Sequence, residues 1–290
     1  MPSLIDMRRR IRTVRNTQQI TKAMKMISAA RLRKAQERAF HARPYAGLLK
    51  EVLESLAARS AEQPGEERHP LLKRRAEERI TAVVLSGDRG LCGAFNTNIL
   101  RAAERFLAEH RQQNVALVAV GRKARDYFRR RNVKIKEEHV GIFARLDYSN
   151  AREIASGIIA SYTEETADAV YLIYNEFKSV IAQRVVVDRL LPLPDFRPGA
   201  AESSALVDYI YEEPPEEIYE RLMPKYVEVQ VYRSLIESNA AEHAARMTAM
   251  DAASSNAGDM IDSLTLRMNR IRQAAITREI IEIVSGAAAL

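Results

Sequence analysis

The sequence of 290 residues has almost no cysteine and no long apolar run, and each absence excludes a class of protein. The single cysteine, Cys92, excludes an internal disulfide framework. No apolar stretch reaches the roughly 18 residues that a membrane-spanning helix requires. We therefore expect a soluble intracellular protein with one or two domains.

Helix-breaking residues are missing from both ends of the chain. Residues 3–43 contain neither proline nor glycine, and residues 225–290 contain no proline and only two glycines. Since an average helix has about 12 residues, these segments predict two exceptionally long helices. A helix with an apolar stripe needs a partner along its length, so we expect the two ends to pair as an antiparallel coiled coil that serves as a shaft.

Apolar residues in both end segments recur at steps of three and four, which is the spacing of a coiled-coil seam. We expect this seam to contain Leu4, Met7, Ile11 and Val14 of the first helix and Ile261, Leu264, Met268 and Ile271 of the second. After a polar step at Thr17 and Gln18, the first stripe is expected to resume with Ile20, Met24 and Ile27.

The second helix is longer than the first, so its last ~20 residues are left without a partner within the chain. That segment ends in an apolar tip, which is expected to be received by another protein. The residues of this tip are Ile280, Ile281, Ile283, Val284 and Leu290.

The middle of the chain alternates strand patterns with helix patterns. Strands are expected at 80–85, 115–120, 133–135, 169–174 and 184–191, the last as a hairpin partner, and helices at 96–110, 123–131 and 150–163. This order predicts a Rossmann-like α/β domain with helices on both faces of the sheet. The fold class is therefore α/β plus long helices, an antiparallel coiled coil with a Rossmann-like middle domain.

Polar, proline-containing stretches mark the expected domain boundaries. We divide the chain into an N-terminal helix with a kink at Pro44, a linker, an α/β domain, an acidic loop and a C-terminal helix. These parts are 1–58, 59–77, 78–195, 196–213 and 214–290.

The formal charge of +7 is unevenly distributed. Residues 1–43 contain twelve Lys or Arg against Asp6 and Glu37, so the remaining residues carry about −3. A basic helix of this kind favours acidic partners. One such partner would be a nucleic acid, which the helix would bind as an arm. The helix lacks the interleaved aromatic residues typical of single-strand binding, which disfavours this reading.

The glycine-rich segment 86–93 is the only candidate for chemistry, because it lies between a strand and a helix where phosphate loops form. Its spacing, G-x-x-G-x-x-G, matches neither the dinucleotide fingerprint nor a Walker loop, which leaves an NADP-type enzyme as a disfavoured alternative. Cys92 has no catalytic partners, and the five histidines lack metal-ligand spacing. We therefore expect no catalytic, cofactor-binding or metal site.

Four motifs resemble the gamma subunit of the F-type ATP synthase, and together they extend over the chain. They are ITKAMKMISAARLRKAQ at 20–36, GDRGLCG at 87–93, HAARMTAM at 243–250 and RQAAITREIIEIVSGAA at 272–288. The resemblance implies a non-catalytic central-stalk rotor inside a hexamer of alpha and beta subunits, with its α/β domain bound to the epsilon subunit and the membrane c-ring. Such a rotor couples proton transport to ATP synthesis or hydrolysis.

The same resemblance implies contacts and a location. The coupling contacts to the beta subunits would be Met24, Lys25, Arg246, Gln273, Thr277 and Glu279. Lys25 and Arg246 are expected to face acidic loops of the beta subunits and not the helix seam. The implied location is the cytoplasmic face of the bacterial plasma membrane, as a peripheral protein without insertion into the membrane and without a nucleic-acid partner.

Overall fold

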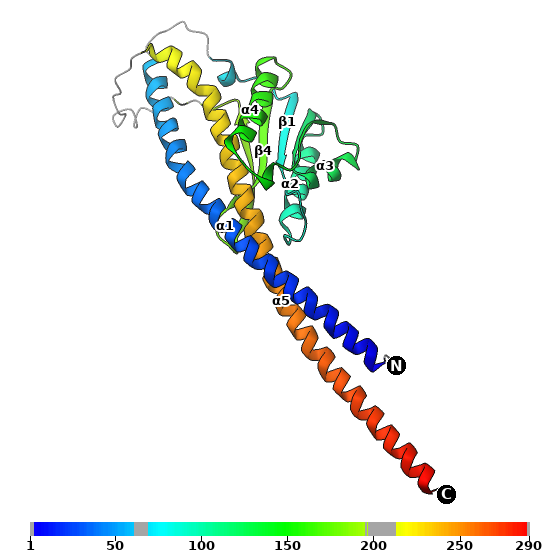
Figure 1. The fold of residues 1–290 in the computed structure, drawn as a ribbon. Helices are drawn as coiled ribbons and strands as arrows, with labels where there is room; N and C mark the ends of the chain where they lie inside the picture. The colour runs from blue at the N-terminus through cyan, green and yellow to red at the C-terminus, as the bar shows by residue number, and fades with distance from the viewer. Residues whose placement is uncertain (1–2, 61–68, 195, 197–212, 289–290) are drawn as a thin grey trace. The chain divides into compact units, whose positions relative to one another are not determined.

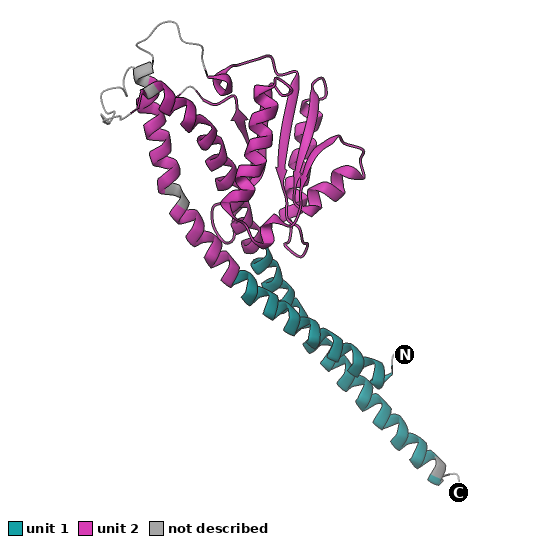
Figure 2. Cartoon of the chain, turned by 45° about the horizontal axis from the view of Figure 1, so that its top comes forward, with its two compact units in different colours: residues 1–29, 246–290 teal, residues 30–245 magenta. Residues whose placement is uncertain are grey.

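The chain forms two compact units in a computed structural model that describes residues 3–60, 69–194, 196 and 213–288. The coiled-coil unit contains residues 1–29 and 246–290, and the α/β unit contains residues 30–245 (Figure 2). Two long helices, α1 (Leu4–Ser60) and α5 (Pro215–Ala288), contribute to both units.

A five-stranded sheet forms the centre of the α/β unit. Its strands are β1 (Arg79–Leu85), β2 (Asn114–Val120), β3 (Ile135–His139), β4 (Ala169–Phe177) and β5 (Gln183–Leu191). They lie in the order β3-β2-β1-β4-β5, and all neighbours are parallel except β4 and β5, which form an antiparallel pair. The expected Rossmann-like topology is confirmed.

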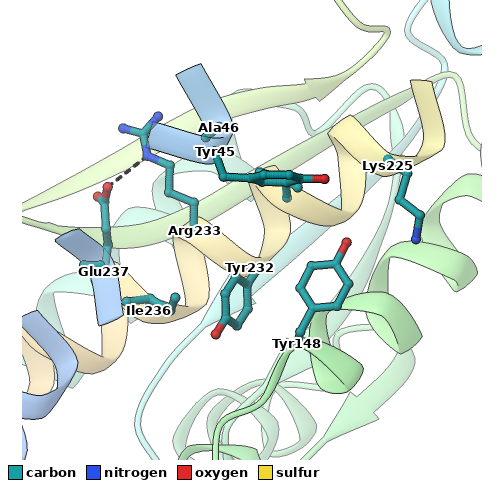
Figure 3. Close-up of a pocket in the computed structure, with 10 residues that line it drawn as sticks. Tyr45, Ala46, Tyr148, Lys225, Tyr232, Arg233, Ile236 and Glu237 are labelled. Carbon is teal, nitrogen blue, oxygen red and sulfur yellow. Dashed lines mark hydrogen bonds and ion pairs between the residues drawn. The ribbon is translucent and has the colours of Figure 1, made fainter. Parts of the chain in front are cut away.

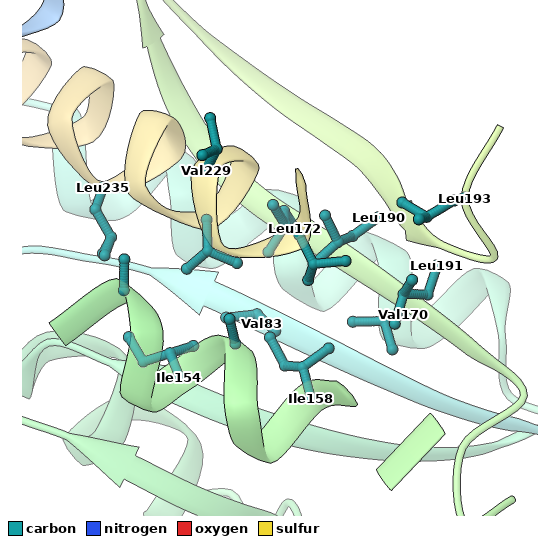
Figure 4. Close-up of a cluster of buried hydrophobic side chains, with 14 of the residues drawn as sticks. Val83, Ile154, Ile158, Val170, Leu172, Leu190, Leu191, Leu193, Val229 and Leu235 are labelled. Carbon is teal, nitrogen blue, oxygen red and sulfur yellow. The ribbon is translucent and has the colours of Figure 1, made fainter. Parts of the chain in front are cut away.

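Helices cover both faces of this sheet (Figure 1). On one face, α2 (Phe95–Glu109) and α3 (Arg122–Arg129) bury their apolar sides against β1, β2 and β4. On the other face, the cluster of Figure 4 joins α4 (Tyr148–Thr163) to the sheet and to α1 and α5. Short 3-10 turns occur at Pro70–Leu72 and Ile142–Ala144.

The central strand β1 illustrates why the sequence forms this three-layer arrangement. Ile80, Ala82 and Val84 face the α2 and α3 layer, whereas Val83 and Leu85 face the other layer. Since both faces are covered, nearly every residue of the strand is apolar and buried, as is usual in parallel sheets.

An ion pair holds β1 to the start of β4. The Arg79 guanidinium donates from Nη2 to Asp168 Oδ1 (2.7 Å) and from Nε to Asp168 Oδ2 (3.1 Å), and the Arg79 backbone N–H also donates to Oδ2 (2.9 Å). Because these hydrogen bonds favour the ionised form, they hold the pKa of Asp168 below its ordinary value.

The boundaries of the two compact units fall at different residues from the expected domain boundaries. Part of each long helix belongs to the α/β unit, because Leu49, Leu53, Met223 and Val227 pack into the core against the sheet. Most of the expected linker and acidic loop, residues 61–68 and 197–212, lies outside the described residues.

The helix α1 continues past Pro44, and its kink there stays a prediction. One strand differs from expectation. Strand β3 begins at Ile135 and continues to His139, beyond the expected 133–135, since an edge strand tolerates the polar residues that hide it from a hydrophobicity scan. None of the described helices has an apolar stretch suited to crossing a lipid bilayer.

Candidate functional site

The coiled-coil unit is an antiparallel pairing of the two long helices (Figure 2). Buried Thr21 and Ser254 share a hydrogen bond between their hydroxyl oxygens (2.6 Å). Gln18 Nε2 donates to the Ser254 carbonyl (3.2 Å), and Lys25 Nζ donates to Asp251 Oδ1 (2.6 Å). These contacts confirm the expected antiparallel coiled coil and fix its register.

The seam follows one unbroken heptad pattern along each helix. Because the helices are antiparallel, the same number of residues is counted back from Thr21 on α1 and forward from Ser254 on α5. This count places Ile11 opposite Leu264, and Leu4 opposite Ile271. On α1 the seam positions, all buried or half-buried, are Leu4, Met7, Ile11, Val14, Gln18, Thr21, Lys25 and Ser28. On α5 they are Met247, Met250, Ser254, Ala257, Ile261, Leu264, Met268, Ile271 and Ala275.

The centre of this seam is polar, and it differs from the apolar stripe expected at Ile20, Met24 and Ile27. The stripe does not resume at Ile20 and Ile27, because these side chains are 60% and 54% exposed and lie off the seam. Gln18, Thr21 and Ser28 occupy the seam positions instead. Choosing residues by hydrophobicity caused this error, whereas continuing the heptad count from Met7 would have found the polar positions.

Beyond Ala275, the described side chains of α5 are exposed. α1 begins at Leu4, which the register places opposite Ile271, so α5 continues past the end of its partner (Figure 2). Leu290 lies outside the described residues. The remaining apolar residues of the tail are between 48% and 71% exposed: Ile276, Ile280, Ile281, Ile283 and Val284.

The residues implied as coupling contacts form two groups. Met24, Lys25 and Arg246 lie in the part of the coiled coil where α1 reaches Ser28 and α5 reaches Met247, whereas Gln273, Thr277 and Glu279 are exposed on the α5 tail. Lys25 forms an ion pair with Asp251 of its own chain, with the two side chains 41% and 61% exposed. Both basic residues differ from the expectation that they lie off the seam and face outward, because Lys25 occupies a seam position and Arg246 is only 8% exposed.

The glycine-rich segment follows β1, the central strand of the sheet. Here the chain leaves toward β2 on one side, while β4, which comes later in the chain, lies on the other side. Nucleotides bind at this point in doubly wound α/β proteins. Here the Asp88 carboxylate accepts hydrogen bonds from the backbone N–H of Arg122 (2.9 Å), the first residue of α3, and of Gly141 (3.1 Å). A carboxylate of the chain itself thus lies at the helix N-terminus, where a phosphate would bind.

A second carboxylate closes the same corner of the sheet. Glu242 of α5 is buried, and its carboxyl carbon would lie 3.0 Å from a Cβ placed on Gly87. Gly121 has a φ of +92°, and a Cβ there would lie 2.1 Å from the Ser86 carbonyl oxygen. Both glycines therefore permit close packing within the chain. Sequence reasoning missed Asp88 and Glu242, because each contacts a segment that is distant in the sequence.

Cys92 is buried beside this turn. Its Sγ accepts a hydrogen bond from Asn96 Nδ2 (3.1 Å), and its side chain packs against Phe95 and Ala241. A buried thiol in an apolar cluster packs as a small apolar side chain, so the geometry favours a packing role.

These observations define a class of protein in which an α/β unit of Rossmann-like topology is combined with a two-helix coiled coil that has an exposed apolar tail. The family model described as ATP synthase matches residues 3–290. The chain belongs to the ATP synthase gamma chain family.

Relatives and solved structures agree with this assignment. The chain is 56% identical to the ATP synthase gamma chain of Solibacter usitatus over 291 residues, covering 100% of this chain and 99% of the relative. It is 49% identical to that of Pelotomaculum thermopropionicum, with 100% of both chains covered. A chain of the Tetrahymena thermophila mitochondrial ATP synthase central stalk and c-ring structure matches with a TM-score of 0.62 and 26% identity, covering 81% of this chain and 99% of that chain.

A chain from the Euglena gracilis mitochondrial ATP synthase, in a structure of OSCP, F1 and the c-ring, has the same fold. It matches with a TM-score of 0.67 and 19% identity, over 99% of this chain and 94% of that chain.

Proposed function

We propose that the chain is the central-stalk rotor of an F-type ATP synthase, transmitting torque between a proton-driven membrane ring and a catalytic hexamer of alpha and beta subunits. The observation that carries the proposal is the α5 tail, which continues beyond the seam with exposed apolar side chains. Such a tail is stabilised when another protein encloses it. The coiled coil gives a stiff helical support for that contact.

The proposed coupling contacts to the beta subunits are the two groups described above. Lys25 can contact an acidic loop only by sharing or releasing Asp251, so this contact would exchange one ion pair for another. Such an exchange between partly exposed groups costs little, typically below about 1 kcal/mol, and therefore suits a contact that is made and broken during rotation. Gln273, Thr277 and Glu279 need no such exchange, because they are exposed.

The chain is proposed to have no catalytic, cofactor or metal site of its own. The support is the position of Asp88 and Glu242, whose carboxyl groups occupy the place where a nucleotide phosphate would have to bind. ATP chemistry would then belong to partner subunits. The α/β unit is proposed to contact the epsilon subunit and the c-ring, which would hold the chain at the cytoplasmic face of the bacterial plasma membrane.

Co-expression with the alpha and beta subunits of the same organism tests the proposal. Ile283→Asp is the informative variant, because Ile283 is 71% exposed and its replacement should change the stability of the isolated chain by no more than about 0.5 kcal/mol. We expect this variant to lower the yield of assembled complex. Ile181→Asp, at an 87% exposed position of the α/β unit, is the control and should assemble normally with alpha and beta.

Equal assembly of both variants would contradict the enclosed tail. Retention of RNA in place of assembly would support a nucleic-acid-binding arm, and tight dinucleotide binding would support an enzyme.

A further inference from the structure

Segment 121–136 is a strongly basic part of the α/β unit. It contains eight Lys or Arg and a single acid, Asp126, so its net charge of +7 equals the formal charge of the whole chain. The segment comprises α3, the turn that follows it and the start of β3. The rotor function proposed above assigns no role to this charge.

The fold gathers most of these charges on one side of α3. Ala124 and Phe128 lie one turn apart and are buried against the sheet. α2 packs beside α3 on the same face of the sheet (Figure 1) and adds exposed Arg101 and Arg105. The positive charge of Arg101 reaches Tyr127 of α3, where it opposes the rise in pKa that burial causes. The outer side of α3 presents only charged residues, which are Arg122, Lys123, Arg125, Asp126, Arg129 and Arg130.

The six Arg and one Lys of these two helices form a surface that we call the basic face. Arg125 pairs with Asp126 (2.7 Å). Arg129 pairs with Glu138 of β3 (2.6 Å). The other cations of the basic face form no ion pair with any residue that the structure describes, and they are Arg101, Arg105, Arg122, Lys123 and Arg130.

The single acid of the outer side does not offset these cations. A hydrogen bond from Arg125 lowers the pKa of Asp126, and the charges of Arg125, Arg130 and Arg122 lower it further. Because several cations act on one carboxylate, they lie close together around it. Neighbouring like charges repel one another, and an anionic surface would relieve this repulsion.

Two other cations of the α/β unit are paired by the chain itself. Figure 3 shows a pocket of about 400 Å³ that three tyrosines line. Lys225 of this pocket pairs with Glu228 (2.8 Å), and Arg233 pairs with Glu237 (2.9 Å). The cations of the pocket are therefore neutralised within the chain, whereas most cations of the basic face are not.

We propose that the basic face docks on an anionic membrane surface, where its Arg and Lys side chains bind the phosphate groups of acidic lipids such as phosphatidylglycerol. The contact is electrostatic and stays at the level of the lipid head groups. The choice of a membrane rests on the proposed rotor function, which holds the α/β unit beside a bilayer.

The chemistry of the basic face fits lipid phosphates. A guanidinium group can bind two phosphate oxygens at once, and six of the seven cations are arginines. Clusters of roughly four to eight basic residues beside a bilayer attract anionic lipids. The large apolar side chains of α2 and α3 are buried or half-buried, so the face offers nothing to insert among the lipid tails.

A nucleic acid fits this face less well. Single-stranded nucleic acids bind in grooves, where aromatic rings stack on the bases. The outer side of a helix is convex and provides no groove. The Arg131 guanidinium already covers the Tyr127 ring, at 3.6 Å from the ring centre.

A fluid lipid surface also suits a rotating subunit. Lipids exchange places within the leaflet, so contact with them has no preferred angle. An acidic loop on a stationary protein would attract the basic face at one angle only and would oppose rotation away from it. A lipid contact can therefore support the α/β unit without stalling the rotor.

The test is fluorescence quenching of the full-length chain by lipids that carry a nitroxide on the head group. The dye is attached at Ala108→Cys, because Ala108 is exposed on the same side of α2 as Arg101 and Arg105, and Cys92 is buried. Vesicles contain phosphatidylcholine, with or without about one third of phosphatidylglycerol. We expect saturable quenching only with phosphatidylglycerol present, and its loss at high salt.

A second dye position shows whether the contact is local. Ile181→Cys places the dye in the turn between β4 and β5, at the opposite edge of the sheet from β3 and at an 87% exposed residue. This dye should be quenched several-fold less than the dye at position 108.

The variants separate the basic face from the charge of the whole chain. Each basic residue near an anionic membrane strengthens binding by about fivefold, so Arg122→Gln, Lys123→Gln and Arg130→Gln together should weaken the titration at position 108 by about 100-fold. All three residues are exposed, so the fold should be kept. The matched control removes three exposed charges from the basic segment of α1 and should change the same titration only a few-fold, with the changes Arg8→Gln, Arg10→Gln and Arg12→Gln.

Absence of quenching at position 108 would overturn the proposal, as would quenching that survives in the α3 variant or falls equally in the α1 variant. Tighter binding of the chain to a short RNA or to polyglutamate than to the vesicles, at matched anionic charge, would overturn it in favour of another partner. Failure of the rotor proposal is distinguished from these outcomes, because it appears as absence of assembly with alpha and beta, which is measured separately.

Discussion

Replacing Ile11 with aspartate tests whether the seam holds the coiled-coil unit together. Ile11 is 9% exposed, and the register places it opposite Leu264. The matched control is Ile5→Asp, since Ile5 belongs to the same helix and is 76% exposed. Both variants add one negative charge to the same basic segment, so they differ mainly in burial.

The expected cost follows from that burial. Removing a buried isoleucine side chain costs about 1.5–3 kcal/mol in lost transfer free energy. Leaving a carboxylate against Leu264 adds more, until the helices separate locally and let water in. A total of about 3–5 kcal/mol is therefore expected for Ile11→Asp, against no more than about 0.5 kcal/mol for Ile5→Asp.

Hydrogen–deuterium exchange of the full-length chain measures this difference locally. Because about 1.4 kcal/mol corresponds to a factor of ten, amides of residues 12–20 and 255–268 should exchange at least about 100-fold faster in Ile11→Asp. In Ile5→Asp they should change only a few-fold. Adding Leu264→Lys to Ile11→Asp should recover part of the protection, because the new charges face each other.

Similar exchange in Ile5→Asp and Ile11→Asp would refute the seam. Absence of coupling between positions 11 and 264 would refute the register deduced from the polar contacts.

Three further predictions concern other contacts. Thr21→Val should cost about 1 kcal/mol in thermal denaturation because it removes the hydrogen bond to Ser254 Oγ, which keeps the Met250 carbonyl as its other partner. Adding Ser254→Ala should cost less than the sum of the two single changes, and strict additivity would contradict the shared hydrogen bond. Gly121→Ala should destabilise the folded chain by at least about 3 kcal/mol, since its Cβ would meet the Ser86 carbonyl oxygen. Gly141→Ala has a similar φ of +84° but no atom within 4 Å of the added Cβ, so it should cost only about 1–2 kcal/mol. Equal costs would contradict the close approach of Gly121 to Ser86. The pKa of Asp168 in the folded chain lies below its ordinary 3.8, so the stabilising effect of the Arg79–Asp168 ion pair should be complete at neutral pH and be lost as the pH falls through the folded pKa. Asp168→Asn should therefore flatten the loss of stability in acid. If denaturant titrations showed the same loss in acid for Asp168→Asn, this role of the ion pair would be contradicted.

Sequence periodicity predicted most of the secondary structure because local patterns determine it. The buried strands β1, β2 and β4 are apolar on both faces, and α2 to α4 have clear apolar sides. The ends of the seam were found for the same reason, since Met7 and Ile11 are apolar and buried.

Features that depend on distant segments could not be found in this way. Thr21 and Ser28 do not look like seam residues until the register with α5 is known. The position of Glu242 beside Gly87 requires the tertiary fold. Arg246 was expected to be exposed from a motif alone, and a motif does not report burial.

Single-molecule rotation is the direct test of whether the chain is a rotor. An Ile181→Cys variant places a thiol at an 87% exposed position of the α/β unit, and Cys92 is buried, so a bead can be attached selectively at the new cysteine. With the alpha and beta subunits fixed to a surface, we expect ATP to drive continuous rotation of the bead in one direction. Beads that stay fixed, or that only fluctuate, while the same complexes hydrolyse ATP at full rate would contradict it.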